Sequence, residues 1–135
     1  MSVIKSVILA IDPGRQKCGL AVVDDEARVL YKTIIQSATL ADEIHKILNQ
    51  YPVSVIVLGD RTTSRQAFQL LKPFGLEIQW VDEDRSSIEG RQRYLRENTK
   101  GLARLLPIGL RVPDRPFDDY VAVILAERFL SRYGK

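Results

Sequence analysis

The chain has 135 residues, of which 45% are hydrophobic and 27% are charged, and its formal net charge is +3. This length predicts one domain, residues 1–135, since domains usually contain roughly 100–200 residues. The single cysteine, Cys18, excludes an internal disulfide, and no Cys and His spacing suits zinc, so we expect a reducing, cytoplasmic setting. The apolar run before Asp12 is too short for a secretion signal or for a membrane span of about 20 residues.

The first third of the sequence predicts three strands that are joined by tight turns. Two β-rich runs, residues 3–11 and 18–24, are separated by Pro13 and Gly14, and a third run covers residues 27–37. Consecutive strands that are joined by short turns commonly pair side by side. We therefore expect an antiparallel meander.

The remainder of the chain alternates predicted helices and strands. Residues 39–51 predict an amphipathic helix with Thr39 as its N-cap and Asp42 at the capping-box position. The apolar run 53–60 predicts a strand that is buried on both faces. Three helices and a strand follow: helix 64–74, strand 76–84, a helix that ends at 98 and starts with Ser86 and Glu89 at capping-box spacing, and an apolar helix 117–134 that packs against the sheet. This alternation implies an α/β fold with a mixed sheet and helices on its faces.

Positive charge is concentrated in the second half of the chain. Residues 85–115 hold eight basic and three acidic residues, which gives this segment +5 and leaves −2 for the remainder. Such a concentration is expected where a protein binds a polyanion such as nucleic acid, although a solvated face explains it equally well at this stage. The basic residues are Arg85, Arg91, Arg93, Arg96, Lys100, Arg104, Arg111 and Arg115.

Acidic residues fall at the ends of three predicted elements. Asp12 follows the first strand, the run from Asp82 to Asp84 follows the fifth, and Asp118 and Asp119 open the last helix. In open α/β sheets, sites gather at the carboxyl ends of strands. Magnesium binds through a few carboxylates and substrate phosphates, and paired metal ions can activate water for phosphodiester hydrolysis. Acids near a basic tract suit that chemistry.

Each acidic group also has a purely structural explanation. An Asp at the start of a helix commonly caps it, which applies to Asp118 and Asp119. The run from Asp82 to Asp84 suits a solvated loop, and Asp12 suits the first position of an Asp-Pro-Gly turn. No group therefore identifies a catalytic site by itself.

Three stretches taken together resemble the YqgF-type, RuvX-like nucleases, relatives of the Holliday junction resolvases with a ribonuclease H-like fold. The stretches are AIDPGRQKCGLAVVD, VDEDRSSIEGRQRY and FDDYVAVILAERFL, and they occur in the family's order. The resemblance implies a mixed five-stranded sheet, made of a three-stranded antiparallel meander plus parallel strands and flanked by helices. It also implies a nuclease that hydrolyses phosphodiester bonds with Mg²⁺ or Mn²⁺. The presumed catalytic residues and metal ligands correspond to Asp12, Glu83 and Asp118.

The sequence departs from the family pattern at two places. Gly59-Asp60-Arg61 stands where members usually have Gly-Leu-Pro, and Asp82-Glu83-Asp84-Arg85 stands where they have Asp-Glu-Arg. The middle ligand can therefore be Glu83 or Asp84. Asp118 and Asp119 leave the same one-residue alternative.

The resemblance leaves the substrate open between precursor ribosomal RNA and branched DNA such as a Holliday junction, and the oligomeric state open between monomer and homodimer. A nucleic-acid-binding module of the same fold, with no catalysis and with the acids as caps, is the main alternative. An Asp-x-Gly hairpin also opens sugar kinase and actin-like ATPase domains. Those proteins close two such domains on a nucleotide, and 135 residues supply only one.

Overall fold

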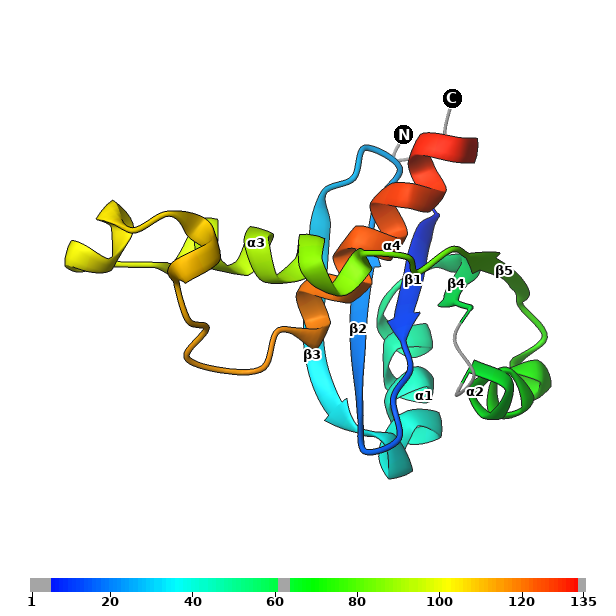
Figure 1. Ribbon diagram of the computed structural model, residues 1–135. Helices are drawn as coiled ribbons and strands as arrows, with labels where there is room; N and C mark the ends of the chain where they lie inside the picture. Colours follow the sequence, from blue (N-terminus) through cyan, green and yellow to red (C-terminus); the bar gives the residue numbers. More distant parts are fainter. Residues whose placement is uncertain (1–5, 61–63, 134–135) are drawn as a thin grey trace.

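The computed structural model describes residues 6–60 and 64–133 (Figure 1). The main elements are β1 (Val7–Asp12), β2 (Lys17–Val23), β3 (Val29–Gln36), α1 (Leu40–Gln50), β4 (Val53–Gly59), α2 (Ser64–Leu71), β5 (Glu77–Val81), α3 (Ser86–Asn98) and α4 (Asp118–Tyr133). Short 3-10 turns occupy Ser37–Thr39, Lys72–Phe74, Gly101–Leu105 and Ile108–Leu110. The predicted strands and helices are confirmed; residues 3–5 and 134 of the predicted elements, and Arg61 of the departing motif, lie outside the described residues.

The five strands form one mixed sheet in the order β3-β2-β1-β4-β5. β1 pairs antiparallel with β2, and β2 pairs antiparallel with β3, so the predicted meander is confirmed. β4 runs parallel to β1, and β5 runs parallel to β4. The carboxyl ends of β1, β4 and β5 therefore lie at the same edge of the sheet.

Side chains of β1 alternate between two apolar layers, as the two-residue period of a strand requires. Leu9 and Ile11 belong to the layer that contains α1, and Ile8 and Ala10 belong to the layer that contains α4. Figure 1 shows α4 crossing one face of the sheet and α1 covering the other. Asp12 follows Ala10 by two residues, so its side chain falls on the face that α4 covers.

The two predicted capping boxes are wrong. Thr39 stands at the N-cap of α1, but its hydroxyl donates to the carbonyl oxygen of Gln36 at 2.8 Å and caps no helical N–H. At α3 the N-cap is Arg85, whose φ of 63° is left-handed, and Ser86 is already helical and fully buried. The N–H of Ser86 donates to the carbonyl of Glu83 at 2.8 Å. A backbone turn therefore starts this helix in place of a side-chain cap.

Helix α4 lies deep in the structure, as its apolar sequence predicts. Residues 121–126 are all buried. None of the described helices is long and apolar enough to cross a membrane. α3 packs closely on α4 at Gly90, where an added Cβ would stand 2.8 Å from Cγ2 of Val121 and 3.1 Å from its backbone nitrogen. This contact therefore requires a residue without a side chain.

The Gly90→Ala substitution is expected to lower the free energy of unfolding. In an exposed helix alanine is favoured over glycine by about 1 kcal/mol, but here the methyl group must push α3 and α4 apart. Overpacking of this kind costs about 1–3 kcal/mol, which urea unfolding measures. Gly109→Ala is the matched control, because nothing lies within 4 Å of a Cβ at that position. A Gly90→Ala protein at least as stable as the parent would contradict the close packing.

Candidate active site at the carboxyl ends of the central strands

Asp12 is the last residue of β1 and is only 7% exposed. In the pairing with β2 it lies opposite Gly19. In the pairing with β4, Ile11 lies opposite Leu58, which makes Gly59 the next neighbour of Asp12. Adjacent strands are about 4.8 Å apart. Asp12 therefore lies between two glycines, on the face of the sheet that α4 covers.

The two glycines leave room for two further acidic residues. A Cβ on Gly59 would overlap with the carboxyl group of Glu83, so that carboxyl group occupies the space where a side chain would stand. A Cβ on Gly19 would overlap with the backbone carbonyl of Asp118. The start of α4 thus lies against β2, and the side chain of Glu83 lies against β4. Asp12, Glu83 and Asp118 are brought to one region of the sheet edge.

Glu83 is the inward-facing member of the acidic run after β5. It is 4% exposed, whereas Asp82 and Asp84 are both exposed. The N–H of Asp84 donates to Oδ1 of Asp82 at 2.9 Å, which closes a turn on the solvent side. Between the two alternatives for a middle ligand, the geometry favours Glu83 over Asp84.

Asp118 and Asp119 have different surroundings although they are adjacent. Asp119 is 4% exposed, and its two carboxylate oxygens accept hydrogen bonds from Arg115 at 3.2 Å each. Lys32 adds an ion pair with Asp119 at 3.9 Å. The hydrogen bond with Asp119 raises the pKa of Arg115 above its ordinary value. Asp118 is half-buried and contacts Lys17 at 3.9 Å, so its carboxylate is the more accessible of the two.

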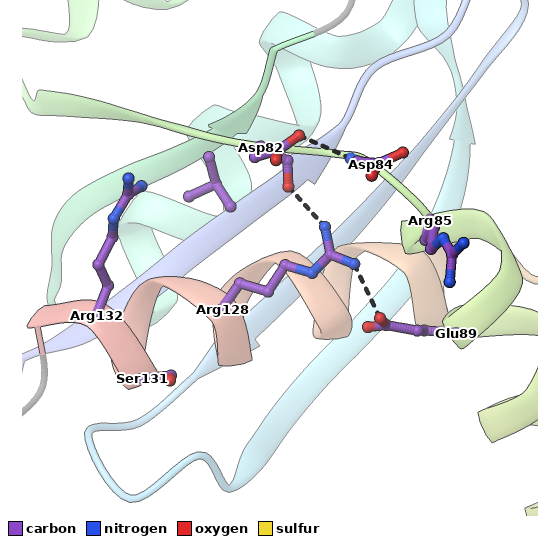
Figure 2. A pocket seen from close by; sticks show the side chains of 8 residues that line it. Asp82, Asp84, Arg85, Glu89, Arg128, Ser131 and Arg132 are labelled. Carbon is purple, nitrogen blue, oxygen red and sulfur yellow. Dashed lines mark hydrogen bonds and ion pairs between the residues drawn. The ribbon is translucent and has the colours of Figure 1, made fainter.

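Two residues that the sequence left without a role hold the backbone around Glu83. Oδ1 of Asp60 accepts a hydrogen bond from the N–H of Glu83 at 3.2 Å. Arg128 of α4 donates to the carbonyl of Asp82 at 2.7 Å and pairs with Glu89 of α3 at 3.0 Å, as Figure 2 shows. The turn that carries Glu83 is therefore tied to β4 on one side and to α3 and α4 on the other.

Arg128 also borders the pocket drawn in Figure 2, whose volume is about 570 Å³. Its charged lining mixes three acidic and three basic side chains: Asp82, Asp84, Glu89, Arg85, Arg128 and Arg132. A lining of mixed sign favours no ligand of a single charge. The solvent-facing side of the acidic run thus differs from the side where Glu83 lies against Gly59.

The eight basic residues of the 85–115 segment divide into two groups. Four donate hydrogen bonds to the protein itself: Arg91, Arg93, Arg111 and Arg115. Burial opposes the charge of Arg93, but hydrogen bonds with Glu97 and Glu127 raise its pKa overall. The other four are exposed and form no side-chain hydrogen bond or ion pair with any residue that the structure describes: Arg85, Arg96, Lys100 and Arg104.

The acidic residues suit a divalent metal ion whose remaining coordination positions are filled by other ligands. Within residues 6–60 and 64–133, no three acidic, His or Cys side chains form a ready-made metal-binding group. Asp12 at the end of β1 and Glu83 in the turn after β5 are, however, two buried carboxylates that both lie next to Gly59 of β4. Magnesium is usually held by one or two carboxylates and takes water or substrate phosphates at its remaining positions. The donor set therefore suits Mg²⁺ or Mn²⁺ together with a phosphate-containing substrate.

Comparison with protein families matches residues 6–88, more than half of the chain, to the Tex protein YqgF-like domain. The match ends before α4. A comparison with curated proteins found no match.

Comparison with solved structures shows which known fold the chain shares. RuvC from Thermus thermophilus in complex with a Holliday junction substrate aligns at a TM-score of 0.58 and 16% identity, over 96% of both chains. A second T. thermophilus RuvC structure aligns at 0.56 and 15% identity, over 96% of this chain and 97% of that one. A ROK family glucokinase from Streptomyces griseus reaches 0.45 at 16% identity, over 65% of this chain and 36% of its own. The chain therefore has the ribonuclease H-like fold of RuvC.

Asp119→Asn and Asp118→Asn are expected to differ in their effect on stability. Asn at 119 weakens a buried, doubly hydrogen-bonded contact with Arg115, so the free energy of unfolding should fall by about 1–3 kcal/mol. Asn at 118 removes a half-exposed charge in the first turn of α4 and should cost less than about 1 kcal/mol. Urea unfolding of the two variants side by side measures both values. Equal losses would show that the two carboxylates do not have the separate environments described above.

Proposed function

This chain belongs to the YqgF-like domain family, and we propose that it is a divalent-metal-dependent nuclease that hydrolyses phosphodiester bonds in structured nucleic acid. One observation carries the proposal. Glycines on both sides of Asp12 admit the carboxyl group of Glu83 and the start of α4 with Asp118. We place this activity in the cytoplasm, where the buried thiol of Cys18 stays reduced.

Each acidic residue has a distinct part in the proposed site. Asp12 would hold the metal ion from the end of β1 and Glu83 from the turn after β5, and Asp118 would face the substrate from the first turn of α4. A bound Mg²⁺ or Mn²⁺ would supply a Lewis acid that activates water and stabilises the leaving oxygen. Asp60 and Arg128 would hold the backbone of the turn that carries Glu83 when substrate arrives.

The exposed cations supply the contact with the substrate backbone. Arg96, Lys100 and Arg104 are available to phosphates, and release of condensed counterions makes such binding strongly dependent on salt. The two substrates to compare are a four-way DNA junction and a structured precursor of ribosomal RNA. A homodimer would present two sites to a symmetric junction.

A non-catalytic nucleic-acid-binding domain is the second candidate function. It is favoured by the absence of a ready-made three-residue metal group among the described residues. Metal-dependent cleavage of either substrate decides between the two functions, because a binding domain would bind the substrates without cutting them.

Asp12→Asn is expected to abolish cleavage and to leave folding and binding intact. Asn keeps the size and the turn-forming oxygen of Asp but lacks the charge that would hold a metal ion. A loss of about 4 kcal/mol in barrier stabilisation slows the reaction roughly a thousandfold. The cleavage rate with Mn²⁺ and the binding affinity in EDTA are measured for parent and variant. If the variant cuts at the parental rate, Asp12 only forms a turn.

Glu83→Gln and Asp84→Asn form a matched pair that tests which acid of the run is functional. Glu83→Gln keeps the packing over Gly59, yet it should slow cleavage at least about a hundredfold, which corresponds to roughly 2.7 kcal/mol. Asp84→Asn alters an exposed carboxylate and should change the rate less than about threefold, or about 0.6 kcal/mol. Single-turnover rates on the same substrate give both numbers. The reverse result would assign the middle ligand to Asp84.

A further inference from the structure

The segment between α3 and α4, residues 99–117, projects from the body of the protein, and we call it the arm (Figure 1). It contains two 3-10 turns, Gly101–Leu105 and Ile108–Leu110, and returns to the sheet at the start of α4. Figure 1 shows its yellow and orange ribbon standing away from the sheet. A groove of about 370 Å³ separates part of the arm from the end of α3.

The arm carries the most exposed apolar side chains among the described residues. These are Leu102 at 84%, Val112 at 82%, Leu105 at 81% and Leu110 at 66%. Exposed large apolar residues elsewhere in the described ranges reach no more than 55%, at Ile88. A concentration of exposed apolar surface in one segment is typical of a site of interaction.

Hydrogen bonds to its backbone hold the arm in place. The guanidinium of Arg111 donates to the carbonyl of Leu106 at 3.0 Å and to that of Arg104 at 2.9 Å. Arg91 of α3 donates in turn to the carbonyl of Arg111. The leucines are therefore displayed on a braced segment.

Unpaired cations border the two leucines at the tip. In a 3-10 turn residues three apart lie on the same side, which places Leu102 and Leu105 together. Lys100 comes two residues before Leu102, and Arg104 lies between Leu102 and Leu105 in the sequence. Both cations are exposed, and neither has a side-chain partner in the described part of the chain. A second copy of the arm would bring like charges together. A nucleic acid complements both features, because it offers phosphates to the cations and base faces to the leucines.

We propose that the arm places Leu102 and Leu105 against unstacked bases, while Lys100 and Arg104 bind the flanking phosphates. Apolar wedges of this kind are inserted between base steps, at an unstacking cost of a few kcal/mol per step. That cost is smaller where stacking is already interrupted, at a branch, bulge or strand end. The inference rests on the proposed function and narrows it to nucleic acids whose base stacking is discontinuous.

The test compares the parent with a Leu102→Ser, Leu105→Ser double variant in EDTA, so that no cleavage occurs. The probes are a four-way DNA junction with 2-aminopurine at the branch point and a linear duplex of the same sequence. A bulged and a continuous RNA hairpin, labelled alike, distinguish RNA from DNA. Leu70→Ser is the matched control, because Leu70 is 47% exposed on α2, outside the arm.

The parent should bind the discontinuous form of its nucleic acid about tenfold tighter than the continuous form, with a rise in 2-aminopurine fluorescence. The double variant should lose both the preference and the fluorescence rise, yet bind the continuous form within about twofold of the parent. Leu70→Ser should behave as the parent. Thermal unfolding checks that all three proteins are folded, which the exposure of these leucines favours.

Other outcomes overturn the proposal in distinguishable ways. If the parent shows the preference and the double variant keeps it, the arm does not contact the bases, and the proposed nuclease function is unaffected. If the parent is a dimer by light scattering and the double variant is a monomer, the arm is a contact between two copies. If the parent binds none of the four probes, the proposed function fails and the inference fails with it.

Discussion

The close approach of other segments to the backbone at Gly19 and Gly59 determines the arrangement of the candidate site. These glycines flank Asp12 on the two neighbouring strands, and all three positions fall on the same face of the sheet. A side chain at either glycine would overlap with the start of α4 or with Glu83. The site therefore depends on strand register, because a shift of one residue would move a glycine to the opposite face.

The burial of two carboxylates beside the same glycine costs hydration free energy. Asp12 and Glu83 are 7% and 4% exposed, so both carboxylates lose hydration on folding. A turn that served only to reverse the chain could keep its Asp at the surface. Two buried oxygen donors at this edge of the sheet are the ligand type that Mg²⁺ and Mn²⁺ prefer, as the chemistry proposed for this site requires.

The sequence predicted the strands and the helices, and it placed the acidic residues at the ends of these elements. Both follow from apolar periodicity and from turn residues. It left Glu83 and Asp84 as alternatives because the choice depends on the geometry of the turn, which includes the left-handed backbone of Arg85 and the hydrogen bond that the N–H of Glu83 donates to Asp60. Neither is encoded in residue spacing. The contact between Arg128 and Asp82 joins residues 46 positions apart, so only the packing of α4 on the turn reveals it.

Charge counting along the sequence overstated the surface that is available to a polyanion. Between positions 85 and 115 only half of the basic side chains are exposed and without a partner in the described part of the chain, and the other half donate hydrogen bonds to the protein itself. Arg115 lies near the end of the arm and donates two hydrogen bonds to Asp119, the residue after the candidate ligand Asp118. A nucleic acid bound along the arm would thus be connected to the acidic site through a short and hydrogen-bonded stretch of chain.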